Sequence, residues 1–149
     1  MTGDAPSNPL ASRLGYLLKH AYLQLTEASA HALAPFGIDG RELAVLTVLA
    51  TDSPLSQLEA AGKLGVDRTT MVALIDALEG KGLVERRRSA QDRRKNTVQL
   101  TPTGQDFLRR AEHARQEMER QFLAPLSGSD ADCLIRALQT LVITPETAG

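Results

Sequence analysis

Two short helical segments that are separated by only two residues constrain the fold more than any other feature of the sequence. The first begins with Ser56, the N-cap of a predicted capping box, and ends at Gly65. Asp67 can cap the second segment, which we expect to run from Arg68 to about Lys81. So short a connection between two helices is typical of a helix-turn-helix, which we therefore expect here.

The segment that follows changes from a helical to a strand pattern. We expect two short strands, from Leu83 to Arg88 and from Asn96 to Leu100, with a polar loop between them. Six of the ten residues from Arg86 to Lys95 are basic, more cations than an edge hairpin needs to resist aggregation. A narrow hairpin tip can enter the minor groove of DNA, whose negative potential attracts arginine. The pattern therefore predicts a charged β-hairpin, or wing.

Amphipathic helices precede this region. Asn8 is a suitable N-cap, and apolar residues at steps of three and four predict a helix from about Pro9 to Ala34. Asp39 can cap the next helix, which we expect from Gly40 to about Ala50. Both helices carry one apolar stripe, so each must pack against another part of the structure.

Two more helices are expected after the hairpin. One runs from Pro102 to about Leu123, and the last, capped by Ser129, runs from Asp130 to about Ile143. The first and the last two helices are more apolar than one small lobe needs, which favours a homodimer, although some of these residues must serve the intramolecular core. The predicted fold is mainly α with a small β-hairpin wing. It consists of a winged helix-turn-helix DNA-binding lobe over residues 39–101 and a helical dimerisation region over residues 9–34 and 102–143.

The distribution of charge is more informative than the total, which is −1 over 149 residues. Residues 63–95 hold nine basic and five acidic side chains, a net charge of +4. The rest of the chain holds eight basic and thirteen acidic side chains, a net charge of −5. A compact basic segment on an acidic body is typical of a module that binds phosphates.

Several classes of function lack support in the sequence. A single cysteine, Cys133, excludes an internal disulfide and a cysteine-based zinc site, and we expect it to be a small buried hydrophobe. There is no glycine-rich phosphate loop and no H-E-x-x-H or G-x-S-x-G motif. We therefore expect no enzymatic activity, no cofactor and no metal. No apolar run is long enough to span a membrane, and no signal peptide is evident, so we expect a cytoplasmic protein.

The candidate DNA-binding residues come from both parts of the lobe. A recognition helix places its N-terminal side chains in the major groove, where arginine can bind guanine and threonine can contact phosphate or a thymine methyl group. Ser56, at the N-terminus of the preceding helix, can offer its hydroxyl and backbone N–H groups to a phosphate. Asp92 can pair with Arg86 or Arg88 across the hairpin and brace the wing. The full DNA-binding set is Ser56, Arg68, Thr69, Thr70, Ala73, Arg86, Arg88, Arg93, Arg94 and Lys95.

One motif leads to a known family. Residues 92–101 read D-x-R-x-x-x-V-x-L-T, and they follow the helix and strand pattern of residues 66–84. In these motifs and in helix order, residues 9–143 resemble the MarR family of bacterial transcription regulators. The resemblance implies a triangular homodimer with a winged helix-turn-helix lobe at each of two corners. It also implies that Arg94 enters the minor groove, that Asp92 braces the wing and that the helix from Arg68 to Lys81 reads the major groove.

The resemblance also implies a sensing role, because members of the family often release DNA when a small aromatic or phenolic anion binds between the two regions. Arg13, Tyr16 and His20 lie at spacing i, i+3, i+7, on one face of the first helix. Arginine can hold a carboxylate, and tyrosine or histidine can hydrogen-bond a phenol. His31 and Arg41 are weaker candidates. The alternative is that these residues are only the polar outer face of an amphipathic helix.

We thus expect a sequence-specific regulator of double-stranded DNA that acts as a repressor and is released by a small aromatic or phenolic anionic ligand. A two-fold symmetric dimer requires a pseudo-palindromic operator with half-sites about one helical turn, ~10 bp, apart. The alternative is a winged-helix module that binds an acidic protein partner without sequence-specific DNA binding.

Overall fold

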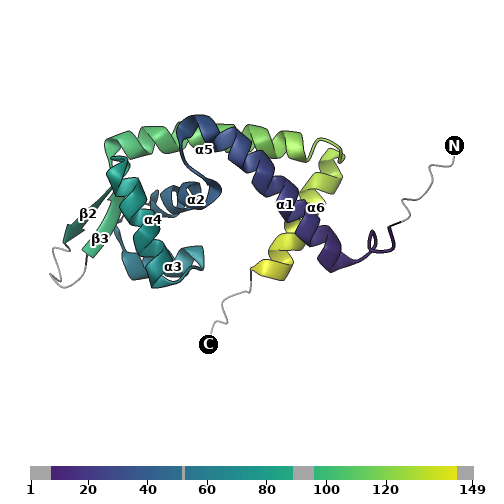
Figure 1. The fold of residues 1–149 in the computed structure, drawn as a ribbon, viewed down its shortest axis with the longest axis horizontal. Coiled ribbons are helices and arrows are strands. Elements are labelled where there is room, and N and C mark those ends of the chain that lie inside the picture. The colour runs from purple at the N-terminus through teal and green to yellow at the C-terminus, as the bar shows by residue number, and fades with distance from the viewer. Residues whose placement is uncertain (1–7, 52, 89–95, 144–149) are drawn as a thin grey trace.

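The computed structural model describes residues 8–51, 53–88 and 96–143. The fold is mainly helical with one small antiparallel sheet, as predicted. In chain order the elements are α1 (Leu14–Leu33), the 3₁₀ turn η1 (Ala34–Phe36), α2 (Gly40–Leu49), β1 (Leu55–Ser56), α3 (Gln57–Leu64), α4 (Arg68–Gly80), β2 (Val84–Arg88), β3 (Asn96–Leu100), α5 (Pro102–Phe122) and α6 (Gly128–Val142). Figure 1 shows α5 as a long helix that joins the lobe containing α2, α3, α4 and the sheet to the end where α1 and α6 lie.

The sheet lies at the edge of this lobe, and its strands are in the order β1-β3-β2. Val84 pairs with Leu100 and Arg88 with Asn96, so the predicted hairpin forms in register. The two-residue strand β1, which the sequence pattern did not predict, adds to the other side of β3. A strand of two residues cannot show an alternating pattern of apolar and polar residues. Strand β1 therefore forms because it pairs with β3, and its own sequence does not predict it.

Apolar residues from α2, α3, α4 and the sheet form the core of the lobe. Side chains spaced by three and four along α4 point to the same side, which explains why Met71, Ile75 and Leu78 are all buried. They meet residues of α2 and the sheet, among which Leu46 and Val98 are almost completely inaccessible to solvent. The predicted helix-turn-helix therefore packs as one unit with the hairpin.

Local hydrogen bonds fix most of the helix starts where the sequence places them. Asp39, Ser56, Asp67 and Thr101 each accept a hydrogen bond from the backbone N–H three residues further on, as N-cap residues do. These caps explain why the starts of α2, α3, α4 and α5 are predictable.

Two predicted helix starts are wrong. Asn8 does accept a hydrogen bond from Leu10 N, at 2.9 Å, but turns closed by backbone hydrogen bonds follow, and α1 begins only at Leu14. The last helix begins at Gly128 and not at Asp130. Its cap is Ser127, whose Oγ accepts from Asp130 N at 3.1 Å, and not Ser129. Two neighbouring serines offered equivalent caps, so the sequence alone did not decide between them.

The last helix, α6, has no buried residue. Leu134, Ile135, Leu141 and Val142 leave an apolar surface exposed on it. Cys133 on the same helix is exposed as well, so the prediction that it is buried is wrong for the single chain. The reason is that the helices and strands of the described residues leave most of α6 uncovered. Among the residues that the structure describes, no helix is both long and apolar enough to cross a membrane.

The lobe is joined to α5 by a close contact between the first turn of α5 and the turn before β2. Thr101 Oγ1 donates to Gly82 O at 2.7 Å and accepts from Gly104 N at 2.9 Å. The backbone N–H of Thr101 donates to Leu83 O at 3.1 Å. A Cβ atom on Gly104 would lie 1.9 Å from Leu83 O, so only glycine allows α5 to approach this closely.

We expect Gly104→Ala to destabilise the protein by ~1–3 kcal/mol or more, because the added methyl group overlaps a backbone carbonyl that has little room to move. Gly62→Ala in α3 is the matched control, since a Cβ there meets nothing within 4 Å and alanine is favoured over glycine inside a helix by up to about 1 kcal/mol. Chemical denaturation measures both changes. Equal stabilities of the two variants would contradict this description of the junction.

Candidate nucleic-acid interface

The N-terminal end of α4 carries the predicted major-groove residues on its exposed side. Arg68, Thr69 and Ala73 are exposed and Thr70 is half-buried, while the opposite side of the helix packs into the core. Within the described parts of the chain, Arg68 has no ion-pair partner. The structure therefore brings all four residues to one accessible helix end, from which side chains can reach a ligand surface.

The cap of α4 is a carboxylate. Asp67 Oδ1 accepts from Thr70 N at 2.7 Å. This backbone hydrogen bond and one from the Thr70 side chain lower the pKa of Asp67, so the carboxylate is ionised at neutral pH. Because the pKa is depressed in the folded state, the contribution of the cap is present above the ordinary carboxyl pKa and is lost as the pH falls through the folded-state value.

Arg86 on β2 links the hairpin to both helices of the helix-turn-helix. Its Nε donates to Gln57 Oε1 of α3 at 2.9 Å, and its two terminal nitrogens donate to Glu79 at 2.7 Å and Asp76 at 2.6 Å on α4. Only 21% of its side chain is exposed. All three nitrogens of the guanidinium thus already have partners, and the base of the hairpin is held against α3 and α4.

The other hairpin cations are placed differently. Arg88 lies exposed at the end of β2 and has no ion-pair partner within the residues that the structure describes. Arg87 is exposed on the other side of the strand and pairs with Glu85 at 2.9 Å. The remaining predicted wing residues, Arg93, Arg94, Lys95 and the bracing Asp92, lie outside the described residues.

Ser56 is a half-buried helix cap. Its Oγ accepts from Glu59 N at 3.0 Å, and its backbone N–H donates to Glu59 Oε1 at 3.1 Å. The reciprocal capping box therefore occupies the backbone N–H groups of Ser56 and Glu59. The hydroxyl proton of Ser56 stays available for a phosphate contact.

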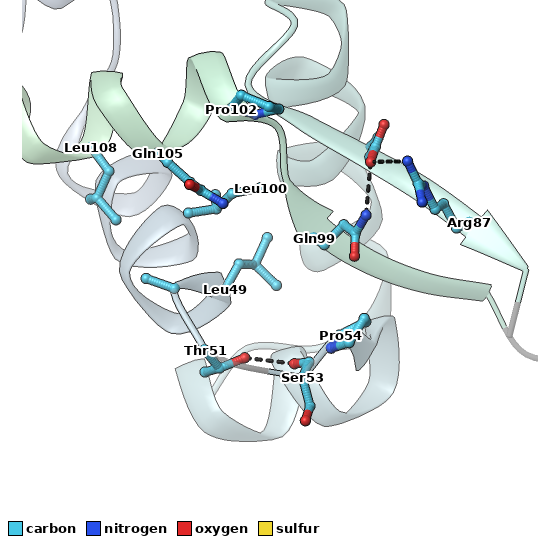
Figure 2. Close-up of a pocket in the computed structure, with 12 residues that line it drawn as sticks. Leu49, Thr51, Ser53, Pro54, Arg87, Gln99, Leu100, Pro102, Gln105 and Leu108 are labelled. Atoms are coloured by element: carbon cyan, nitrogen blue, oxygen red, sulfur yellow. Dashed lines mark hydrogen bonds and ion pairs between the residues drawn. The ribbon is translucent and has the colours of Figure 1, made fainter.

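A cavity of about 590 Å³ lies on the other side of the sheet, between β2, β3, the start of α5 and the segment after α2. Figure 2 shows Gln99 linked through the Glu85 carboxylate to Arg87, with Pro54 and Thr51 across the cavity. None of the predicted DNA-binding or effector-binding residues lines this cavity. It is thus separate from the α4 surface.

The structure brings together only part of the predicted effector set. The rings of Tyr16 and His20 lie 4.1 Å apart between centroids, and Tyr16 Oη accepts from Asn8 Nδ2 at 2.9 Å. Arg13 precedes them as the exposed N-cap residue of α1. His31 is eleven residues beyond His20 on the same helix, which at 1.5 Å per residue is about 16 Å along its axis.

His31 instead borders a hollow between α1 and α5. Arg41 lies on a different helix, at the start of α2. The five predicted residues therefore do not line one site.

A groove runs between α1, α2 and α5, and Arg41 is the one predicted effector residue among those that line it. It consists of two adjoining hollows, of about 440 and 490 Å³, which share Leu25, Ala44 and Leu64. Tyr22 borders one hollow and Met118 the other. The lining comes from segments far apart in the chain, which explains why no local motif revealed it.

The α5 wall of this groove is acidic. Arg115 lies between two carboxylates, with Nε 2.9 Å and 3.0 Å from the two oxygens of Glu112 and a terminal nitrogen 2.5 Å from Glu119 Oε2. Hydrogen bonding to Glu112, more than the charge of the two glutamates, raises the pKa of Arg115 above its ordinary value. One cation bound by two anions leaves a net charge of −1 on this wall, so it favours a neutral or hydrogen-donating part of a ligand over an anionic one.

Comparisons with known proteins agree with this architecture. A family model described as the MarR family matches residues 40–95. The putative transcriptional regulatory protein for the hcr operon of Thauera aromatica is 32% identical over 133 residues, which cover 89% of this chain and 80% of that protein.

Two solved structures are of proteins named CouR. A transcriptional repressor, CouR, bound to a 23-mer DNA duplex is 36% identical, with a TM-score of 0.84 over 89% of this chain and 94% of that one. CouR from Rhodococcus jostii RHA1 bound to p-coumaroyl-CoA is 25% identical, with a TM-score of 0.79 over 91% and 95% of the two chains. The chain belongs to the MarR family and is a transcriptional regulator.

Proposed function

We propose that this protein is a sequence-specific repressor that binds double-stranded DNA as a homodimer and is released by a small aromatic or phenolic anion. The observation that carries the DNA-binding part is the exposed N-terminal end of α4, with Arg68, Thr69 and Ala73 accessible and Arg68 unpaired in the described structure. A repressor that is 36% identical and has the same fold is bound to a DNA duplex, which supports the assignment.

In this proposal α4 lies in the major groove. Arg68 contacts a guanine, and Thr69, Thr70 and Ala73 contact neighbouring bases or phosphates. The hairpin tip, with Arg93, Arg94 and Lys95 braced by Asp92, enters the adjacent minor groove. Ser56 and Arg88 contact phosphates, and Arg86 acts as a positioning residue that fixes the hairpin relative to α4.

The exposed apolar surface at the other end of the molecule supports dimerisation. Contiguous apolar side chains on α6, on α1 and on the segment before it would remain in water in a single chain, which is unfavourable by about 25 cal/mol for each Å². A second copy of the chain covers them in our proposal. The large exposed apolar residues at this end are Leu10, Leu14, Leu17, Leu18, Tyr22, Leu23, Leu126, Leu134, Ile135, Leu141, Val142 and Ile143.

The groove between α1, α2 and α5 is the effector site in our proposal. It lies between the DNA-binding lobe and the helices that carry the apolar surface, so a ligand there contacts both parts. The relative CouR from Rhodococcus jostii RHA1 binds p-coumaroyl-CoA, an aromatic thioester. A ligand that binds one lobe orientation more tightly than the DNA-bound orientation lowers the affinity for DNA by that difference alone. The apolar part of the ligand contacts Leu25 and Leu64, and its anionic group lies away from Glu112 and Glu119.

Selection of bound duplexes from a random pool tests the proposed DNA-binding function. We expect a palindromic consensus with half-sites about one helical turn apart. In Arg68→Ala the preference should relax at one symmetric pair of positions, at a cost of ~1–3 kcal/mol per lost guanine contact. If folded protein enriches no sequence, the proposal fails, and a protein-interaction module becomes the better interpretation.

A matched pair of substitutions on β2 separates positioning from contact. Arg86→Gln breaks the links to Asp76 and Glu79, and we expect a loss of about 1 kcal/mol of stability with an unchanged salt dependence of DNA binding. Arg88→Gln removes the same charge two residues away. It should leave stability unchanged and reduce the slope of log affinity against log salt by about two, because the homodimer loses one phosphate contact from each copy. Chemical denaturation and titrations at several salt concentrations measure both effects, and the reverse result for the two variants would contradict these roles.

A further inference from the structure

Arg41 lies beside the recognition helix although it belongs to a different element. It is exposed in the first turn of α2. Together with Thr69, Thr70, Ala73 and Lys81 of the α4 region, it lines a hollow of about 540 Å³ between the two helices. The same side chain therefore borders the surface that carries three of the predicted base-contacting residues.

The other charged groups at this hollow already have partners. Lys81 Nζ donates to Glu42 Oε2 and to Gly37 O, both at 2.8 Å. The other carboxylate oxygen of Glu42 accepts from Asp39 N at 3.2 Å, and Asp39 Oδ1 accepts from Glu42 N at 2.9 Å. Within the described residues, Arg41 has no ion-pair partner. It is thus the cation of this hollow that is available for a ligand.

The stability of α2 does not explain a cation at this position. The N-terminal end of a helix is the positive end of its dipole, so an arginine in the first turn is slightly unfavourable. Asp39 and Glu42 already supply the carboxylates of the capping box at this end of α2, so the helix dipole does not require an external anion. The exposed arginine adds five N–H donors suited to phosphate, and its guanidinium is the group that can bind an external anion next to the N-terminal half of α4.

We propose that Arg41 binds a backbone phosphate of the operator, at the edge of the major groove that α4 enters. This inference rests on the proposed DNA-binding function and extends the interface from α3, α4 and the hairpin to α2. It moves Arg41 from the effector-binding set of the sequence analysis to the DNA-binding set. The contact positions the protein on DNA without reading sequence, as phosphate contacts do.

Arg41 also borders the hollow that contains Tyr22 and Leu25, so an effector anion is the competing occupant. The two possibilities predict different DNA affinities for an Arg41 variant that has no effector bound. A phosphate contact affects DNA binding of protein that has been denatured and refolded free of small molecules, whereas an effector contact does not.

The test measures operator affinity of refolded protein between 50 and 200 mM salt for wild type, Arg41→Gln and Arg41→Lys. Arg109→Gln is the charge-matched control, because Arg109 is exposed on α5 and lies outside the hollow. Each phosphate contact contributes about 0.9 to the slope of log affinity against log salt, and the homodimer carries two copies of Arg41. Arg41→Gln should therefore reduce the slope by about 1.8 and lose about 12-fold less affinity than wild type over this range. Arg41→Lys and Arg109→Gln should keep the wild-type slope, and the base preference of all variants should be unchanged.

An unchanged slope in Arg41→Gln overturns the inference while leaving the proposed function intact. An equal decrease of the slope in Arg109→Gln also overturns it, because the effect would then come from net charge alone. If the wild type itself prefers no duplex sequence, the proposed function fails and the inference fails with it. Circular dichroism and thermal melting show that each variant is folded before its slope is compared.

Discussion

The packing of the first turn of α5 against the turn before β2 determines how the two ends of the molecule are related. Thr101 bonds to Gly82 O and caps α5, and Gly104 allows the helix to approach Leu83 without a side chain between them. From this contact α5 continues for 21 residues toward the end where α6 begins. A straight helix of this length spans about 30 Å, so a small change of angle at the junction displaces the lobe by several ångströms relative to α6.

Some charged side chains around α4 form ion pairs within the lobe, and others are free to bind a ligand. The net charge of −1 does not reveal this division. Glu42 pairs with Lys81, and Asp76 and Glu79 hold Arg86. These acidic residues fix the hairpin and α2 against α4. In the described part of the lobe, the cations without ion-pair partners include Arg41, Arg68 and Arg88. The acidic residues of this region thus organise the lobe, and the unpaired cations carry the proposed contacts to phosphate and bases.

Most features that depend on neighbouring residues were predictable from the sequence, and features that depend on distant residues were not. The predicted caps at Asn8 and Ser129 are the local exceptions. The caps at Asp39, Ser56, Asp67 and Thr101 act over three residues, so the starts of four helices could be located, and the hairpin followed from its alternating pattern. Strand β1 exists only through its pairing with β3. The exposure of Cys133 could not be predicted, because it depends on whether another element covers α6. The groove that we propose as the effector site unites residues of α1, α2, α5 and the end of α3. The link from Arg86 to Gln57 joins residues 29 apart in the chain.

In the proposed homodimer, contacts between the α1, α5 and α6 helices of two chains hold the two lobes so that their α4 helices lie one DNA turn apart. Pulsed electron paramagnetic resonance measures this spacing directly, with a spin label at Ala77→Cys on α4 in a Cys133→Ser background. With operator duplex bound, we expect one interprotomer distance near the half-site separation of about 34–36 Å, broadened by the length of the label. The absence of any interprotomer distance, or a distance far from one turn on bound DNA, would contradict it.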